Sequence, residues 1–333
     1  MKHLTLIVPD GETVLDSIVA TYMLFNRANQ FQMGIGKEPV FKIELAGLSK
    51  EIKLYGGLFS IRPKSNLKEI AKTDLVIIPA FQPNINFSES LKNNKQIISW
   101  ILDQYKNGAE IISLCTGAFL LAETGLLDGR KCSTHWALAD KFKQMFPKVK
   151  LNTKKIITEE NGVYTSGGAF SFLNFLLLII EKYYDRQTAV TCSKLFEIDM
   201  DRSSQAPFEI FSGQKKHLDE EIKKAQLYLE NNFNEKINIE NLAADLAVGR
   251  RNFDRRFKKA TGNTHIEYLQ KVKIEAAKKN LESTRKTISE VMYEVGYSDL
   301  KSFRTTFKKI TGLPPLEYRN KFNREPVSSE RMF

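Results

Sequence analysis

The chain has 333 residues and a formal net charge of +11. This length is enough for two domains that each bury a hydrophobic core. The charge is unevenly spread, because residues 215–333 contain 25 Lys and Arg against 17 Asp and Glu, whereas residues 1–214 contain 25 against 22. We therefore expect the last third of the chain to bind a polyanion.

The apolar runs are too short for a signal peptide or a membrane span. The first run ends at Pro9, and the most apolar segment, 169–180, is interrupted by Asn174, whereas a spanning helix needs about 20 apolar residues. The three cysteines have no metal-like spacing and are typical of reduced thiols. These features predict a cytoplasmic protein with no membrane partner, no metal and no cofactor.

Residues 1–200 alternate short apolar runs with helical patterns. Strands are expected at residues 4–8, 40–46, 75–79 and 110–114, and helices at 13–29, 91–106, 116–124, 169–184 and 186–196. Such alternation predicts an α/β fold, a mostly parallel sheet with helices on both faces, as in flavodoxin-like sandwiches. The ligand site of such a fold lies at the carboxyl ends of the strands.

One of these strand ends carries a candidate sensing site. The apolar run 110–114 leads directly into Cys115, Thr116 and Gly117 and then into a helix, which places the sulfur beside free backbone N–H groups. Such a position lowers the pKa of a thiol and favours an oxyanion. His135 supplies an imidazole and Asp16 a carboxylate. The alternatives are that the cysteine is small packing filler and that His135 only caps the helix that follows.

The same residues resemble a known family. The run 113–119, Ser-Leu-Cys-Thr-Gly-Ala-Phe, and its continuation through 125–130 to Thr134-His135-Trp136 are similar to the class I glutamine amidotransferase-like domain of the PfpI type. Residues 205–208, Gln-Ala-Pro-Phe, resemble the segment with which that domain closes. In the version of this domain found in regulators, the resemblance implies a site that senses a ligand and has no catalytic residues.

A linker is expected between two domains, at residues 1–200 and 218–322. Residues 201–217 contain Pro207 and Gly213 and show no helical periodicity, as is typical of linkers. Residues 323–333 form a polar tail.

From residue 239 to residue 318 one pattern occurs twice, fifty residues apart. The segment 253–268 returns as 303–318, with an aromatic pair four residues apart in each copy. A short helical pattern, 239–246 or 288–295, and a turn containing glycine precede each pair. Short helix, tight turn and second helix make the helix-turn-helix layout.

The second helix of each copy has a polar and basic face opposite its aromatic pair. Counted at 100° per residue, this face carries Arg251, Arg255 and Lys258 in the first copy and Lys301, Ser302, Thr305 and Lys308 in the second. Such side chains contact base edges and phosphates, and two such helices fit major-groove segments about 34 Å apart. The alternative is a helical repeat whose basic residues are only solvated.

These residues also carry a resemblance. The segment from about 219 to 320 is similar to an AraC-type DNA-binding domain, with residues 266–281 as the long helix between the two units. The most specific match is Gly296-Tyr297-Ser298 together with Gly312-x-Pro314-Pro315-x-x-Tyr318-Arg319. With the PfpI-type domain, the whole chain resembles the GlxA-type regulators.

We therefore predict a transcription regulator that binds a double-stranded DNA operator. Its first domain is expected to sense a small polar metabolite of unknown identity, with a carboxylate or amide group, and to form a homodimer. The alternative is a cysteine-dependent hydrolase or amidotransferase-like enzyme that carries a DNA-binding domain.

Overall fold

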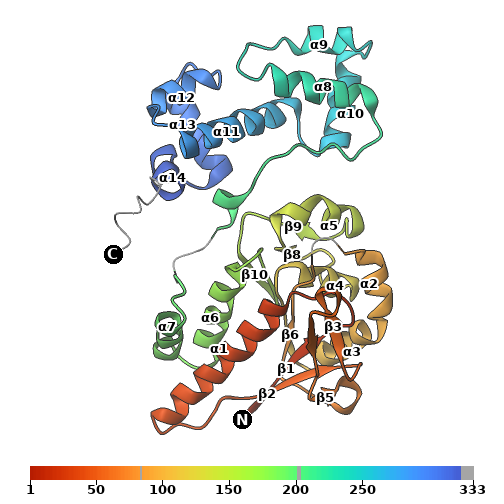
Figure 1. Cartoon of the computed structure of the whole chain (residues 1–333). Coiled ribbons are helices and arrows are strands. Elements are labelled where there is room, and N and C mark those ends of the chain that lie inside the picture. The colour runs from red at the N-terminus through yellow and green to blue at the C-terminus, as the bar shows by residue number, and fades with distance from the viewer. Residues whose placement is uncertain (83–84, 201–203, 324–333) are drawn as a thin grey trace. The chain divides into compact units, whose positions relative to one another are not determined.

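The computed structural model describes residues 1–82, 85–200 and 204–323. The chain divides into two compact units, Met1–Gln205 and Ala206–Phe333 (Figure 1). Among the described residues, no helix combines the length and the apolar character that a bilayer span requires.

The first unit is built on one seven-stranded sheet. Its strand order is β10-β11-β7-β6-β1-β2-β5. The bounds are Lys2–Val8 for β1, Phe41–Gly47 for β2, Ser65–Asn66 for β5, Leu75–Ile78 for β6, Glu110–Ser113 for β7, Ile157–Glu160 for β10 and Val163–Ser166 for β11. Neighbouring strands pair in parallel, except that β10 and β11 are antiparallel. The predicted, mostly parallel sheet is thus confirmed.

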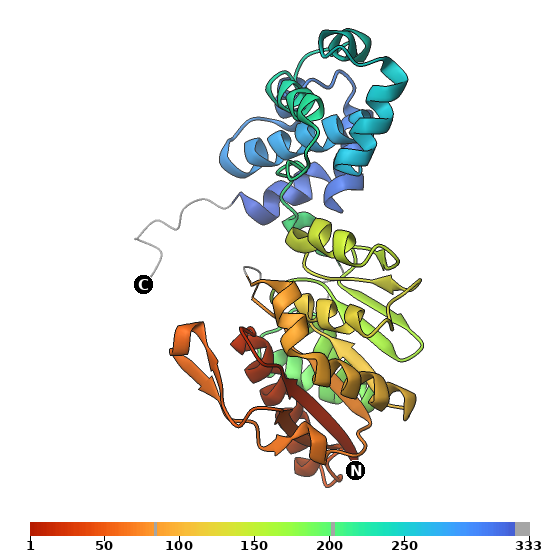
Figure 2. The same ribbon diagram turned by 90° about the vertical axis from the view of Figure 1, so that its right-hand side faces the viewer.

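Two smaller pairs of strands flank this sheet. β8 (Lys131–Cys132) pairs with β9 (Lys150–Leu151), and β3 (Ile52–Leu54) forms an antiparallel hairpin with β4 (Phe59–Ile61). The hairpin projects from the body of the first unit (Figure 2).

Helices cover both faces of the sheet. One face is covered by α1 (Leu15–Gly34), α6 (Ser171–Tyr183) and α7 (Arg186–Leu195), and the other by α2 (Phe87–Asn93), α3 (Lys95–Lys106), α4 (Ala118–Glu123) and α5 (Ala139–Met145). Because successive side chains of a strand point to opposite faces, Leu4 and Leu6 enter the first core whereas Ile7 enters the second. From Leu4 to Val8 the strand is apolar except for Thr5, because both of its faces are buried there.

The second unit is helical in its described part. Its helices are α8 (Glu220–Asn231), α9 (Ile239–Asp245), α10 (Arg250–Thr261), α11 (His265–Ser283), α12 (Ile288–Glu294), α13 (Leu300–Thr311) and α14 (Pro315–Phe322). Each copy of the repeat has its own core, one around Phe253 and Phe257 and one around Phe303 and Phe307. The long helix α11 contributes to both, which confirms the tandem helix-turn-helix arrangement.

The sequence fixes the ends of these helices by capping. Thr264 and Glu267 form a capping box at the start of α11, and Thr287 and Glu290 form one at α12. α10 ends at Thr261 and is followed by Gly262, whose φ of 70° is left-handed and suits glycine best.

Residues that follow Gln205 are packed on the helical unit. The ring of Phe208 lies 5.6 Å from that of Phe322, and the ring of Phe211 lies 5.1 Å from that of Tyr268. Residues 206–211 are therefore attached to the second unit, although they fall within the segment expected to be a linker. Residues 201–203 of that segment, and the expected tail from residue 324 onward, lie outside the described residues.

Candidate ligand site and DNA-binding surface

Cys115 occupies a strained corner at the carboxyl end of β7. Its φ of 52° is unusual for a residue with a side chain, and the residue is only 6% exposed. The turn that follows is pressed against the end of β6, because a Cβ added to Gly117 would lie 2.6 Å from the carbonyl oxygen of Pro79. Glycine is therefore required where the sequence predicted a tight strand-to-helix turn.

The Cys115 thiol is neutral rather than activated. Burial, assisted by the nearby negative charge of Asp16, raises the pKa of the Cys115 thiol to about 11, although the backbone N–H groups of Ala169 and Thr116 face the sulfur. The prediction that this position lowers the pKa of the thiol is wrong, because the cost of burying a thiolate exceeds the stabilisation by the N–H groups.

Asp16 lies in the first turn of α1, close enough to Cys115 for its charge to act on the thiol. The start of this helix is tied to the end of β6, since Val14 N donates to Ala80 O (2.7 Å) and Ala80 N donates to the Ser17 hydroxyl (3.1 Å). One carboxylate oxygen of Asp16 is buried and has no hydrogen-bond partner among the described residues. A buried polar atom without a partner is unusual in a folded protein.

His135 has a capping role in this structure. Its Nδ1 accepts a hydrogen bond from Ala137 N (3.1 Å), and burial lowers its pKa. Its ring rests on Gly168, where an added Cβ would lie 2.7 Å from His135 Cγ. The capping alternative foreseen from sequence is therefore the contact observed.

Two side chains hold the backbone of Cys115 by hydrogen bonds. The Thr134 hydroxyl donates to Cys115 O (2.9 Å), and Cys115 N donates to the Ser166 hydroxyl (3.1 Å). The Thr116 hydroxyl donates to Phe81 O (2.6 Å) and accepts from Phe81 N (2.7 Å), which leaves Thr116 fixed as well. We call the residues Asp16, Cys115, Thr116, Gly117 and His135 the Cys115 site.

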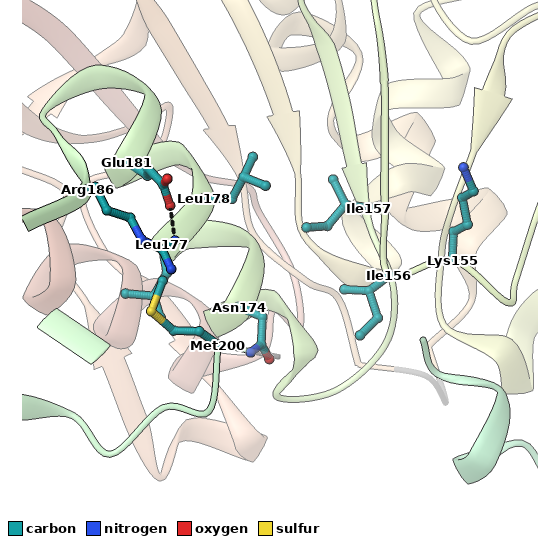
Figure 3. Close-up of a pocket in the computed structure, with 9 residues that line it drawn as sticks. All are labelled: Lys155, Ile156, Ile157, Asn174, Leu177, Leu178, Glu181, Arg186 and Met200. Atoms are coloured by element: carbon teal, nitrogen blue, oxygen red, sulfur yellow. Dashed lines mark hydrogen bonds and ion pairs between the residues drawn. The ribbon is translucent and has the colours of Figure 1, made fainter. Parts of the chain in front are cut away.

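A separate groove of about 410 Å³ lies between β10 and α6. Lys155 stands at one end of it, and the ion pair of Glu181 with Arg186 (2.6 Å) stands at the other (Figure 3). The lining includes no residue of the Cys115 site. Within the described ranges, no cluster of three or more His, Cys, Asp or Glu could hold a metal ion.

In the second unit, α10 and α13 expose the predicted DNA-binding residues. The exposed set is Arg251, Arg255, Lys258, Lys301, Ser302, Thr305 and Lys308. The aromatic residues of both helices are fully buried on the opposite face. Each helix therefore presents one polar face to solvent, as the 3.6-residue period predicts.

The two helices begin differently. Asp299 caps α13 by accepting a hydrogen bond from Ser302 N (2.6 Å), whereas Gly249 has no side chain with which to cap α10. In α10, Arg255 donates to the Asn252 side chain (2.9 Å), and in α13 the Thr305 hydroxyl donates to Lys301 O (2.8 Å). These contacts preset the orientation of both side chains.

Comparison with known proteins matches both units. Residues 19–182 match the DJ-1/PfpI family, and residues 242–321 match a helix-turn-helix domain. An uncharacterized HTH-type transcriptional regulator in the cgkA 5' region of Pseudoalteromonas carrageenovora is 36% identical over 131 residues, which cover 39% of this chain and 75% of the relative. The chain belongs to the AraC-type transcriptional regulators with a DJ-1/PfpI domain.

A second relative of this regulator extends over both units. The HTH-type transcriptional regulator GbdR of Pseudomonas aeruginosa is 27% identical over 229 residues, which cover 68% of this chain and 61% of GbdR. The match therefore spans less than two thirds of the length of that relative. A protein of Vibrio parahaemolyticus with a known crystal structure shares the fold, with 24% identity and a TM-score of 0.52 over 58% of this chain and 98% of that chain.

Several residues of this regulator were not predicted as functional. Arg304 is exposed on α13 beside the predicted DNA-binding residues. Its position on the helix could have added it to that set. Arg256 is basic but is held by Asp219 through two hydrogen bonds of 2.8 and 2.6 Å, so it stabilises the unit. Gln205 is 2% exposed and contacts the loops around Cys115; only its place in the Gln-Ala-Pro-Phe motif pointed to it.

Proposed function

We propose that this chain is a transcription regulator that binds a double-stranded DNA operator through α10 and α13. The observation that carries this proposal is the pair of exposed basic faces on two helices that α11 joins within one helical unit. A protein that reads chromosomal DNA works in the cytoplasm.

The test is selection of binding sites from random-sequence DNA with the full chain. The selected operator is then titrated at several salt concentrations, because phosphate contacts make affinity fall with salt. Failure to enrich any sequence, or affinity that is equal for selected and unselected DNA, contradicts the proposal.

We propose that the Cys115 site senses a small polar metabolite. The N–H groups of Ala169 and Thr116 favour a carboxylate or amide oxygen, and the unpaired oxygen of Asp16 favours a donor group on the same molecule. A ligand that bears both groups would satisfy the buried polar atoms better than either group alone.

The enzyme alternative is disfavoured by the protonation state of the thiol. With a pKa of about 11, only about one thiol in ten thousand is a thiolate at pH 7. An assay of the full chain over a panel of amides and aldehydes, with Cys115→Ala as control, decides the question. Turnover that this substitution abolishes would establish the enzyme instead.

We further propose a homodimer formed through the first unit. Val19, Tyr22 and Met23 are exposed on one face of α1, with exposed fractions of 44%, 45% and 50%. Apolar side chains three and four residues apart form a stripe that a second copy can cover.

A further inference from the structure

Gln205 joins the two loops that surround Cys115. Its side-chain oxygen accepts a hydrogen bond from Gly168 N (3.1 Å), and its side-chain nitrogen donates to Thr134 O (3.0 Å). Its own backbone N donates to Lys154 O (3.2 Å), which fixes the position of the residue in the first unit. A buried amide that bridges two loops holds them at a set separation.

Both loops contact the Cys115 residue itself. Thr134 holds the Cys115 carbonyl oxygen, and Ala169, next to Gly168, directs its N–H group toward the sulfur. The side chain of Gln205 packs closely against Gly167, since a Cβ added to this glycine would lie 2.9 Å from the Gln205 side-chain nitrogen. A ligand that displaces the Thr134 loop or the Gly168 loop therefore also displaces the side-chain amide of Gln205.

The chain directly after Gln205 is fixed to the helical unit. Ala206 and Pro207 are buried, and the 3₁₀ turn Ala206–Phe208 lies against α13. Directly after this turn, Lys278 Nζ donates to Glu209 O (2.6 Å), and Phe211 N then donates to the Glu275 carboxylate (3.1 Å). Gln205, whose side chain holds the two loops, is therefore joined by one peptide bond to the turn Ala206–Phe208, which packs on α13.

We propose that Gln205 couples the Cys115 site to the DNA-binding helices. It positions the Gly168 and Thr134 loops, and it passes their displacement to α13 through the turn Ala206–Phe208. This inference rests on the proposed function. Coupling requires that an occupied site and an empty site favour different states of the helical unit.

The experiment uses iodoacetamide as the probe, with the full chain and its selected operator. The Cys115 thiolate displaces iodide to form a carbon–sulfur bond, which leaves an amide group in the site. Operator Kd is measured by fluorescence anisotropy before and after alkylation, and peptide mass spectrometry confirms the modified cysteine. Cys115→Gln places an amide there without alkylation, so the slow reaction of a buried thiol does not limit the test.

Gln205→Met removes the hydrogen bonds of the side-chain amide, including those with Gly168 N and Thr134 O, while filling a similar volume. Ser204→Ala is the matched control, because it removes the hydrogen bond of the adjacent residue to Lys154 O (3.0 Å) and keeps the Gln205 amide. Melting curves verify that all variants fold.

We expect an amide at Cys115 to change operator Kd by on the order of fivefold or more in the wild type and in Ser204→Ala. In Gln205→Met the basal Kd should stay within about twofold and the response should vanish. If operator Kd still responds fully to the amide in Gln205→Met, the proposed role of Gln205 is wrong. The same conclusion follows if the response is lost in Ser204→Ala as well as in Gln205→Met. No response in the wild type to either perturbation overturns the coupling, whereas absence of a selected operator refutes the proposed function instead.

Discussion

Replacing Gly168 with alanine tests how closely the Gly168 loop packs against His135. The added Cβ would lie 2.7 Å from His135 Cγ and closer still to His135 Cδ2, so the ring must move. The ring is held by its hydrogen bond with Ala137 N. Overpacking of this kind costs about 1–3 kcal/mol, and we expect Gly168→Ala to lower the free energy of unfolding of the first unit by that amount.

Tryptophan fluorescence during urea unfolding measures this effect. The chain has two tryptophans, Trp100 and Trp136, and both lie in the first unit, so the signal follows that unit alone. Gly34→Ala is the control, because nothing lies within 4 Å of its added Cβ. It should be neutral or stabilising by up to about 1 kcal/mol, since glycine is unfavourable in a helix.

A double variant identifies the cause of the loss. When His135→Ala removes the ring first, Gly168→Ala should cost less by about 0.5–3 kcal/mol, because the two residues are in contact. Additive losses in the double variant, or a Gly168→Ala protein as stable as the wild type, would refute the close packing of this loop on His135.

Three further predictions concern DNA, pH and assembly. Arg255→Ala and Thr305→Ala should each reduce the preference for one base by about 1–3 kcal/mol at one position of the operator. Lys308→Ala should instead weaken binding to all DNA sequences alike and lower the slope of log affinity against log salt concentration by about 1. Equal losses of affinity for all sequences in all three variants would contradict this. Because the thiol pKa is raised to about 11, the rate of Cys115 alkylation should climb about tenfold per pH unit from pH 7 to 10, and a plateau near pH 8 would exclude the raised value. Light scattering should find a dimer at tens of micromolar, and Tyr22→Glu should yield a monomer; a wild-type monomer would remove the basis for the dimer.

Four strands of the sheet, β1, β2, β6 and β7, were expected from sequence. β10 was missed because Ile157–Glu160, at the sheet edge, includes two glutamates. β11 (Val163–Ser166) was missed as well, although all four of its residues are buried, because Thr165 and Ser166 interrupt its apolar character. The expected helix 91–106 extends over two helices, α2 and α3, because Asn94 is buried at the break between them and its side chain holds both Asp10 N and Asp10 O. A tertiary contact of this kind leaves no periodic signal in the sequence.

The candidate site was predicted only in part. Asp16 follows β1 and Cys115 follows β7, and only β6 lies between these strands. The two residues converge because the carboxyl ends of parallel strands share one edge of the sheet, which topology alone implies. The pKa of the Cys115 thiol was predicted to be lowered but is raised. The direction of this shift depends on how deeply the sulfur is buried, which the sequence pattern does not show. Gln205 could not be placed by pattern, since its partners lie 37 and 71 residues away in sequence.

The long helix α11 restricts how this chain can change during evolution. With 19 residues it is about 28 Å long, and its side chains enter both cores of the helical unit. Inserting one residue would rotate the second helix-turn-helix unit by about 100° and shift it by about 1.5 Å relative to the first. The exposed faces of α10 and α13 would then point in different directions relative to each other than they do now. On the proposed mode of DNA binding, point substitutions can alter which bases the protein prefers, but a single insertion or deletion within α11 would prevent both helices from contacting one side of a duplex.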